Sequence, residues 1–333
     1  MKAIVFTNPG KIEVQEVPLP VVEEGWALIK VSHAGICGSD LTVYSGYHPR
    51  AKAPLVPGHE ICGYLVSDLP GLPAGTFVTV NPLLSCGQCD PCLSGNSHVC
   101  QSLKLIGIDR DGGMAEYVTA PIHHILPVPE GVSRRSAAFI EPIAVSVHTV
   151  RQSGYVPGDN ALIFGAGAIG MSVALTLREL GCHDVTICEP NKIRVEKASS
   201  LGFRAIQTHP ELISELLKLT NNKGFDFIYD CAGHQSVAEM LPDLIKVKGT
   251  IVIVAGYKQS PAMNFQKGMF KEFSIKFVRV YRDEDFKIAC QLAKSQPLYA
   301  EVVTHELPIK EAQHGFDLLL TPSDAIKVTF KFD

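Results

Sequence analysis

The 333-residue chain lacks the features that mark membrane and nucleic-acid-binding proteins. No apolar run reaches the roughly 20 residues that a membrane-spanning helix needs. The apolar start at residues 1–6 stops at Asn8-Pro9-Gly10, which is too short for a signal peptide. A net charge of −4 gives no electrostatic reason to bind nucleic acid or an anionic membrane. Repeats, charged tails and low-complexity segments are also missing, so we expect a cytoplasmic globular protein.

Hydrophobic and cysteine residues, by contrast, are plentiful. Hydrophobic residues make up 46% of the chain and charged residues 19%, as in a well-buried globular protein. The length predicts one large or two medium domains. The ten cysteines in a reducing compartment favour metal binding or buried thiols over disulfides.

A glycine-rich stretch organises the second half of the chain. Residues 161–170 read ALIFGAGAIG, and a helical pattern follows. Strand, tight turn and helix in this order are typical of a dinucleotide site, in which glycines let the backbone approach a pyrophosphate at a helix start. A plain structural turn is the alternative. The next apolar run ends in Glu189, 19 residues after Gly170, where an acid binds the ribose hydroxyls of NAD. The predicted cofactor residues of this motif are Gly165, Ala166, Gly167, Ala168, Ile169, Gly170 and Glu189.

Glu189 predicts NAD over NADP, because its carboxylate accepts hydrogen bonds from a ribose diol and repels a 2′-phosphate. Arg194 lies five residues further on and offers a contact to a 2′-phosphate, which would instead favour NADP.

Strand and helix patterns alternate from about residue 136, which predicts an α/β fold with a doubly wound parallel sheet. A helix is expected over 136–151, and strands over 161–164, 184–188, 205–208, 225–229, 250–255 and 273–280. Ligands bind at carboxyl ends of such strands, which adds Cys231, Ala232, Val254 and Ala255 to the predicted cofactor residues. The first 130 residues form a β-rich region with little helix. We expect the closing segment to pack back on it, giving one domain of residues 1–147 with 282–333 and a nucleotide-binding domain of 148–281.

Four cysteines in 15 turn-rich residues follow the spacing C-x2-C-x2-C-x7-C. Four thiolates can close a tetrahedral S4 shell around a structural zinc ion, or hold an iron–sulfur cluster. Ferredoxin spacing differs, and clustered surface cysteines without a metal would be a liability. The predicted ligands are Cys86, Cys89, Cys92 and Cys100.

A second candidate group is dispersed along the chain. Cys37, His59, Glu60 and Glu141 each stand beside a glycine or a proline. A catalytic zinc uses about three protein ligands of N, S and O type and keeps one position open. Each residue also has an ordinary explanation: a core thiol, a surface pair or an acid at a helix start.

Together, these motifs resemble the zinc-dependent medium-chain alcohol dehydrogenases along nearly the whole chain. The segments GICGSD at 35–40, GHE at 58–60, the cysteine lobe and GAGAIG at 165–170 follow one order, and IEPIAV at 140–145 resembles the polyol branch, which includes sorbitol dehydrogenase. The resemblance implies a GroES-like domain, two zinc ions per chain, and a catalytic zinc surrounded by Cys37, His59, Glu60 and Glu141. It also implies that Ser39 contacts the substrate, that Asp40 orients His59, and that the chain forms homodimers or homotetramers, with the edge strand near 273–280 as one interface.

One position departs from the family pattern. Relatives often carry a proton-relay histidine where this chain has Thr42. The relay then ends in water, uses His48 or runs through the nicotinamide ribose.

The leading hypothesis is NAD-linked oxidation of a secondary hydroxyl of a polyol or sugar acid. Polar residues in the loop between the first ligands favour such a substrate, as do two further arginines. The candidates are Tyr44, Tyr47, His48, Arg50, Lys52, Arg110 and Arg279. Oxidation of an amino alcohol, as in threonine dehydrogenase, is an alternative within the class, and a non-enzymatic zinc module is an alternative outside it. His123 and His124 are interpreted as structural, because neighbours in a strand face opposite sides.

Overall fold

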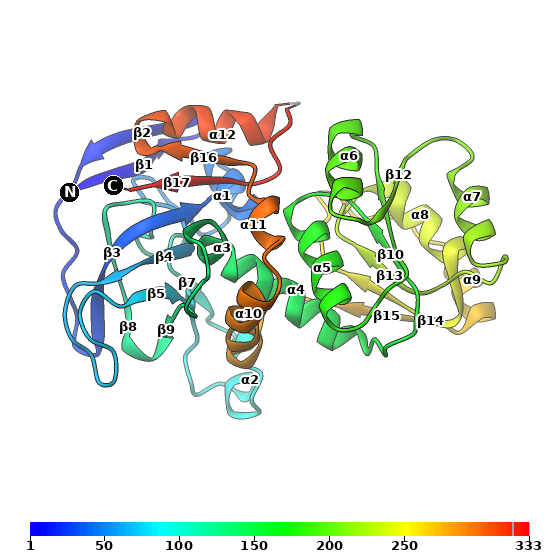
Figure 1. Cartoon of the computed structure of the whole chain (residues 1–333), viewed down its shortest axis with the longest axis horizontal. Helices are drawn as coiled ribbons and strands as arrows, with labels where there is room; N and C mark the ends of the chain where they lie inside the picture. The colour runs from blue at the N-terminus through cyan, green and yellow to red at the C-terminus, as the bar shows by residue number, and fades with distance from the viewer. Residues whose placement is uncertain (322, 333) are drawn as a thin grey trace. The chain divides into compact units, whose positions relative to one another are not determined.

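The computed structural model describes residues 1–321 and 323–332. The chain separates into two compact units (Figure 1). Unit 1 combines residues 1–144 with the closing segment from Tyr281, and unit 2 comprises Val145–Val280. Positions 322 and 333 of the predicted closing segment lie outside the described residues.

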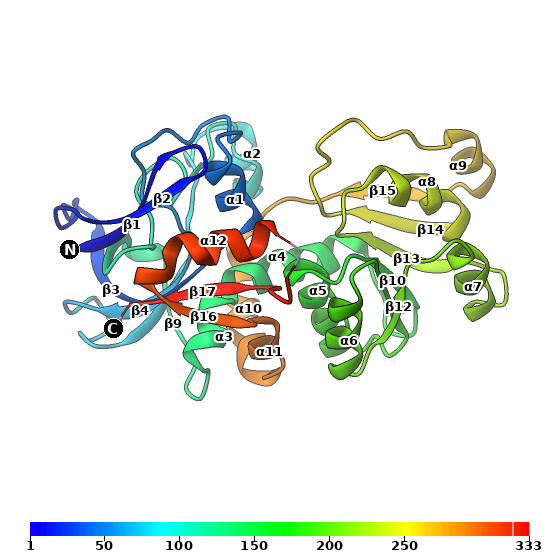
Figure 2. The same ribbon diagram turned by 90° about the horizontal axis from the view of Figure 1, so that it is seen from above.

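Unit 2 is built on a six-stranded parallel sheet with the order β12-β11-β10-β13-β14-β15. Figure 2 shows helices α5 and α6 on one side of this sheet and α8 and α9 on the other. The apolar runs are long because the helices cover both faces. The strands are β10 (Ala161–Phe164), β11 (Val185–Glu189), β12 (Arg204–Gln207), β13 (Phe225–Asp230), β14 (Ile245–Ile253) and β15 (Ser274–Phe277). The helices are α5 (Ala168–Glu179), α6 (Lys192–Ser200), α7 (Leu212–Leu219), α8 (Gln235–Leu244) and α9 (Phe265–Lys271).

The strand order reverses beside β10. Successive strands leave β10 through β11 to β12 on one side and through β13 and β14 to β15 on the other. Open α/β sheets bind ligands at this switch point, outside the carboxyl ends of the strands. The predicted α/β class with a doubly wound sheet is confirmed.

Unit 1 contains a seven-stranded sheet with the order β16-β17-β3-β4-β5-β9, in which β8 also pairs with β3. A hairpin, β1-β2, lies beside it. C-terminal β17 runs antiparallel to β3, so the closing segment does return to the N-terminal part. The strands are β1 (Lys2–Asn8), β2 (Lys11–Glu16), β3 (Trp26–Gly35), β4 (Glu60–Leu65), β5 (Phe77–Val80), β6 (Leu83–Leu84), β7 (Lys104–Leu105), β8 (Tyr117–Pro121), β9 (Ile125–Pro127), β16 (His305–Pro308) and β17 (Val328–Lys331).

The helices of unit 1 are short and lie around this sheet. They are α1 (Gly38–Tyr44), α2 (Asp90–Leu93), α3 (Arg134–Ala138), α10 (Asp283–Ser295), α11 (Tyr299–Val302) and α12 (Ala312–Leu320), with 3-10 turns η1 (Ser97–Val99), η2 (Ile122–His124) and η3 (Ile309–Glu311). Helix α4 (Ile140–Ser153) begins in unit 1 and ends in unit 2. Within the described part of the chain, every helix is too short or too polar to span a membrane.

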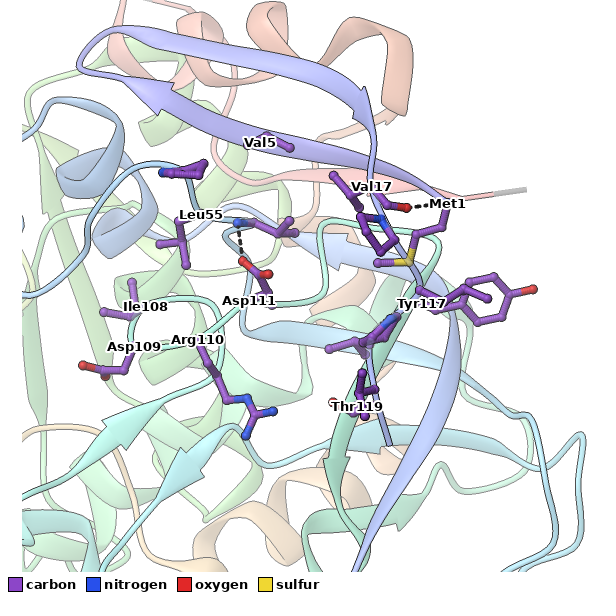
Figure 3. A pocket seen from close by; sticks show the side chains of 18 of the residues that line it. Met1, Val5, Val17, Leu55, Ile108, Asp109, Arg110, Asp111, Tyr117 and Thr119 are labelled. Atoms are coloured by element: carbon purple, nitrogen blue, oxygen red, sulfur yellow. Dashed lines mark hydrogen bonds between the residues drawn. The ribbon is translucent and has the colours of Figure 1, made fainter. Parts of the chain in front are cut away.

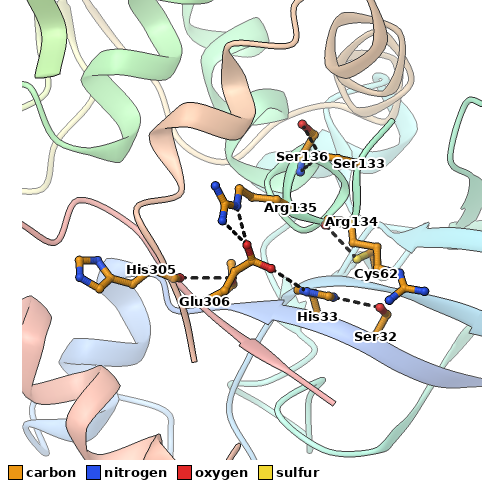
Figure 4. A network of polar contacts seen from close by, with 10 residues as sticks. Ser32, His33, Cys62, Ser133, Arg134, Arg135, Ser136, His305 and Glu306 are labelled. Carbon is orange, nitrogen blue, oxygen red and sulfur yellow. Dashed lines mark hydrogen bonds and ion pairs between the residues drawn. The ribbon is translucent and has the colours of Figure 1, made fainter. Parts of the chain in front are cut away.

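A polar network joins three of these elements (Figure 4). Glu306 on β16 accepts a hydrogen bond of 2.6 Å from Arg135 Nε on α3 and lies 3.1 Å from His33 Nε2 on β3. The second ring nitrogen of His33 lies 2.9 Å from Ser32 Oγ. Burial raises the pKa of Glu306, but Arg135 and His33 outweigh it, and the net shift is downward.

Three local predictions were wrong. The expected helix over 136–151 is two helices, α3 and α4, with Phe139 between them. The helix tolerates Pro142 because this residue lies in the first turn of α4, where backbone N–H groups have no acceptor within the helix. The segment that begins at Gly38 is helix α1 rather than loop. His123 and His124 lie in a 3-10 turn, with ring centroids 4.3 Å apart, instead of on opposite faces of a strand.

Candidate active site

Three of the predicted catalytic residues meet in unit 1. The ligand atoms of Cys37, His59 and Glu60 all lie within 4.8 Å of one another. Cys37 is the N-cap of α1, His59 directly precedes β4, and Glu60 is the first residue of that strand. Pairing of β3 with β4 places Glu60 opposite Gly35, two residues before Cys37. The sheet register therefore joins two segments that are distant in the sequence.

Asp40 holds the two ligand segments together from the interior. Its side chain is fully buried. One carboxylate oxygen accepts a hydrogen bond from the Cys37 N–H at 2.8 Å, and the other accepts one from the Gly58 N–H at 3.3 Å. The second oxygen also lies 3.7 Å from His59 Nδ1. Asp40 thus lies where a group that orients a metal-bound imidazole is needed.

The chemistry of this cluster fits a metal ion. The side-chain atoms His59 Nδ1 and Glu60 Oε2 are buried and lack a hydrogen-bond partner among the described residues. Ser39 Oγ lies 3.4 Å from His59 Nε2. Burial lowers the pKa of His59, but Asp40, Cys37 and Glu141 together raise it well above its usual range. One thiol, one imidazole and one carboxylate are a donor set that suits zinc.

Glu60 has a buried partner that the sequence did not reveal. Lys327, just before β17, donates hydrogen bonds to the Ile36 carbonyl at 2.8 Å and to Glu60 Oε1. Burial lowers the pKa of Lys327, yet the charges of Glu60 and Cys37 give a net upward shift. A side chain at Gly35 would not fit, since its Cβ would lie 2.0 Å from Glu60 Oε2. The only sequence signal was a lysine within an apolar terminal strand.

Glu141 and Tyr281 border the same cluster. Glu141, in the first turn of α4, lies outside the group of three within 4.8 Å, but its charge acts on His59. Burial raises the pKa of Glu141 to about 7. The Tyr281 side chain is 1% exposed, and its hydroxyl has no hydrogen-bond partner among the described residues. Burial first, then the charges of Glu141, Glu60 and Cys37, raise the pKa of Tyr281. Sequence reasoning missed Tyr281, which no polar motif marks.

The four-cysteine lobe is also assembled. The Sγ atom of Cys89 lies 3.5 Å from that of Cys92 and 3.8 Å from that of Cys100. The Sγ atoms of Cys86 and Cys92 are 4.0 Å apart. Zn–S bonds of 2.3 Å in a tetrahedron place sulfurs about 3.8 Å apart. Backbone N–H groups lower the pKa of the Cys86 thiol to about 6, which favours the thiolate. The lobe fits a closed S4 zinc site.

Several of the predicted substrate residues have partners of their own in the structure, and their contact with a substrate stays a prediction. The Tyr44 side chain packs against Phe316 and donates to Asp317 at 3.2 Å. Arg110 stacks over Trp26 and pairs with Glu23 at 2.7 Å. Arg279 belongs to unit 2.

Two loop residues of this set, Arg50 and Lys52, line a cavity in unit 1. The cavity has a volume of about 890 Å³, and its lining includes Arg110 and several apolar side chains but none of the metal cluster. Figure 3 shows the cavity from close by. Arg50 is held there by Asp109 at 3.2 Å and by the Leu103 carbonyl. Tyr47 is exposed, and the His48 ring nitrogen Nδ1 accepts the Ala51 N–H at 3.1 Å.

The glycine turn of unit 2 has the geometry of a phosphate site. Gly165 has φ +97°, and a Cβ at Gly170 would lie 1.8 Å from the Gly165 carbonyl oxygen. Gly167 is the N-cap of α5, and Ala168 and Ile169 begin that helix. Glu189, at the end of β11, accepts the Ala166 N–H at 2.7 Å, so the acid and the turn are physically linked. Arg194 lies on α6.

Two family models match the chain. Residues 23–130 match the alcohol dehydrogenase GroES-like domain, and residues 168–295 match the zinc-binding dehydrogenase model. Sorbitol dehydrogenase of Halalkalibacterium halodurans is 34% identical over 98% of both chains. The chain belongs to the zinc-dependent alcohol dehydrogenase family. Its membership makes it an oxidoreductase, and the predicted resemblance is confirmed.

Further relatives of this dehydrogenase differ in substrate. L-galactonate-5-dehydrogenase of Escherichia coli K12 is 30% identical over 92% of both chains, and L-threonine 3-dehydrogenase of Bacillus velezensis is 29% identical over 96% of this chain and 95% of its own. Among solved structures, RspB of E. coli CFT073 in complex with NADH superposes with a TM-score of 0.92 at 28% identity, covering 100% of this chain and 99% of its own. A zinc-binding dehydrogenase of Sinorhizobium meliloti 1021, solved with NADP, gives 0.90 at 26% identity, covering 99% of both chains.

Proposed function

We propose that this protein is a zinc- and NAD-dependent dehydrogenase that oxidises a secondary hydroxyl of a polyol or a sugar acid. The observation that carries the proposal is the convergence of Cys37, His59 and Glu60, with two buried polar atoms lacking partners, in a chain similar to sorbitol and galactonate dehydrogenases. A zinc ion bound there supplies Lewis-acid polarisation of a hydroxyl, and bound NAD supplies the hydride acceptor. Cys37, His59 and Glu60 would hold the ion, and Glu141 is a further acid beside them.

The surrounding side chains orient and neutralise this site. Asp40 lies 3.7 Å from His59 Nδ1 and accepts hydrogen bonds from both ligand segments, and Lys327 balances the buried charge of Glu60. Ser39 lies within reach of the His59 ring and is proposed to contact the substrate hydroxyl. The cysteine lobe is proposed to hold a second, structural zinc through Cys86, Cys89, Cys92 and Cys100.

The cofactor site is assigned to the glycine turn and the carboxyl ends of β11, β13 and β14. Residues 165–170 would receive the pyrophosphate, Glu189 the adenosine ribose, and Cys231, Ala232, Val254 and Ala255 the nicotinamide half. The domain limits 1–147 with 282–333 and 148–281, like the cytoplasmic location, stay predictions.

The preference for NAD is tested at Glu189. The wild type is expected to have at least about tenfold higher kcat/KM with NAD than with NADP, and Glu189→Ser to narrow that gap, because the carboxylate no longer repels a 2′-phosphate. Glu196→Ser, which changes an exposed acid on α6, is the matched control. A wild-type preference for NADP would overturn the assignment.

A second copy of the chain is the proposed partner of unit 2. Strand β15 is an edge strand, and its Phe277 is 78% exposed, an arrangement that favours pairing with another strand. Helix α9 adds exposed Phe265, Met269 and Phe270. We propose a homodimer or homotetramer that uses this edge, and Phe277→Lys should shift the mass measured by light scattering toward the monomer.

The substrate class is tested with a panel of sorbitol-like polyols, sugar acids, threonine and simple alcohols. Turnover with NAD is expected to be highest for a polyol or a sugar acid. Highest turnover of threonine would move the protein to the amino-alcohol class, and highest turnover of ethanol or 2-butanol would refute a polar substrate.

A further inference from the structure

A buried carboxylate lies at the switch point of unit 2 and has no role in the site described so far. Asp230 ends β13, and its side chain is 0% exposed. The register pairs it with Phe164, directly before the glycine turn. Asp230 therefore stands beside the place where the strand order reverses.

The Asp230 carboxylate acts as an acceptor in all its hydrogen bonds. Oδ1 accepts the N–H groups of Ala232 and Gly233, both at 2.9 Å, and Oδ2 accepts the Tyr257 hydroxyl. Acceptor-only bonding is the pattern of an ionised carboxylate. Among the described residues, no lysine, arginine or histidine forms an ion pair with it. The structure thus holds a negative charge with dipoles alone, without a cation.

The same residue fixes the loops that follow β13 and β14. Its main-chain carbonyl accepts the N–H groups of Val254 and Ala255, both at 3.0 Å. A Cβ at Gly233, which has φ +63°, would lie 2.9 Å from the Gly256 carbonyl oxygen, so the two loops touch. Burial first, then Asp230, raise the pKa of the Cys231 thiol and of the Tyr257 hydroxyl, as expected for neighbours of a negative charge.

Strand order decides which half of a dinucleotide comes near Asp230. With the pyrophosphate at the glycine turn after β10 and the ribose at Glu189 after β11, the remaining half extends the other way, to β13 and β14. That half carries the nicotinamide ring, which is positively charged in NAD+ and neutral in NADH. An opposite charge nearby stabilises the cation selectively.

We infer that Asp230 is an electrostatic positioning residue which favours binding of NAD+ over NADH. The inference rests on the proposed dinucleotide site. A carboxylate with a purely structural role would affect the binding of NAD+ and NADH equally, whereas this inference predicts a preference for NAD+.

The test compares dissociation constants for NAD+, by calorimetry, and for NADH, by fluorescence, in the complete protein. Asp230→Asn keeps the shape and removes the charge. The NAD+ constant should rise about tenfold relative to the NADH constant, which corresponds to the loss of about 1.4 kcal/mol of charge–charge attraction. Should this variant not fold, Asp230→Ser also removes the charge and carries the same expectation.

Two controls separate charge from structure. Tyr257→Phe removes a hydrogen bond but keeps the charge, so the ratio of the two constants should stay near the wild-type value. Asp226→Asn makes the same change on the same strand, at an acid already paired with Lys246, and should also leave the ratio unchanged. Equal weakening of both cofactors by Asp230→Asn, or no weakening, would overturn the inference while leaving the dinucleotide site intact. If the wild-type protein binds neither NAD+ nor NADH, both the inference and the proposed dinucleotide site are refuted.

Discussion

The two proposed metal sites of unit 1 are built in opposite ways. The cysteine lobe takes all four ligands from 15 consecutive residues, from exposed Cys86 to buried Cys100. The cluster of Cys37, His59 and Glu60 depends on pairing between β3 and β4 and on a lysine from the closing segment. The lobe is therefore a local structure, whereas the cluster requires the whole unit to fold. Variants of the cluster are therefore expected to affect turnover, and variants of the lobe to affect stability.

The largest effect is expected at the cluster. His59→Ala removes the only imidazole of the three-residue group, so turnover should fall by more than the 10–100-fold that loss of an outer-shell group costs. The lobe should keep its zinc, and NADH binding should change little. Turnover and metal content are the measurements, and His123→Ala, at an exposed histidine of unit 1, is the control. Near-normal turnover of the variant would contradict a catalytic cluster.

Changing the lobe should produce the converse result. Cys89→Ser is expected to lose one zinc per chain and to lower the thermal unfolding temperature, because a structural zinc contributes binding free energy to folding. Protein that remains folded should keep a metal at the cluster. Leu93→Ala, an exposed change in the same lobe, should alter neither zinc content nor unfolding temperature. A Cys89→Ser protein with unchanged zinc would show that the lobe binds none.

The smallest of the three effects concerns the buried ion pair. Lys327→Met leaves Glu60 buried without its cation, which should lower the free energy of unfolding by about 3–5 kcal/mol. Denaturant unfolding measures this loss. Lys331→Met, at an exposed lysine of β17, is the matched control and should have little effect. If Lys327→Met is as stable as the control, the pair does not stabilise the cluster.

The same contrast explains what could be predicted from the sequence. The lobe, the glycine turn and the doubly wound sheet carry local signals: ligand spacing, glycine positions and alternating patterns. The link from Glu189 to the Ala166 N–H and the meeting of Cys37 with His59 were expected only as roles, not as contacts. The partners of Lys327 and Tyr257, which are Glu60 and Asp230, could not be predicted from the sequence, because tertiary packing alone brings them together.

The substrate residues show the limit most clearly. Arg50 and Arg110 are polar residues near the first ligands in the sequence, but Asp109 and Glu23 engage them at a cavity that the metal cluster does not line. Nearness to the metal ligands in the sequence therefore did not decide which cavity these two arginines line. Glu60 and Tyr281, in contrast, lie far apart in the sequence and still act on each other electrostatically.

Zinc counting on the purified wild type, coupled to a turnover assay, tests the central claim most directly. Two zinc ions per chain are expected, and stepwise chelation should abolish NAD-dependent oxidation of a polyol or sugar acid when the ion at Cys37, His59 and Glu60 is removed. A protein that holds a single zinc in the cysteine lobe and still oxidises its substrate at full rate would contradict the account.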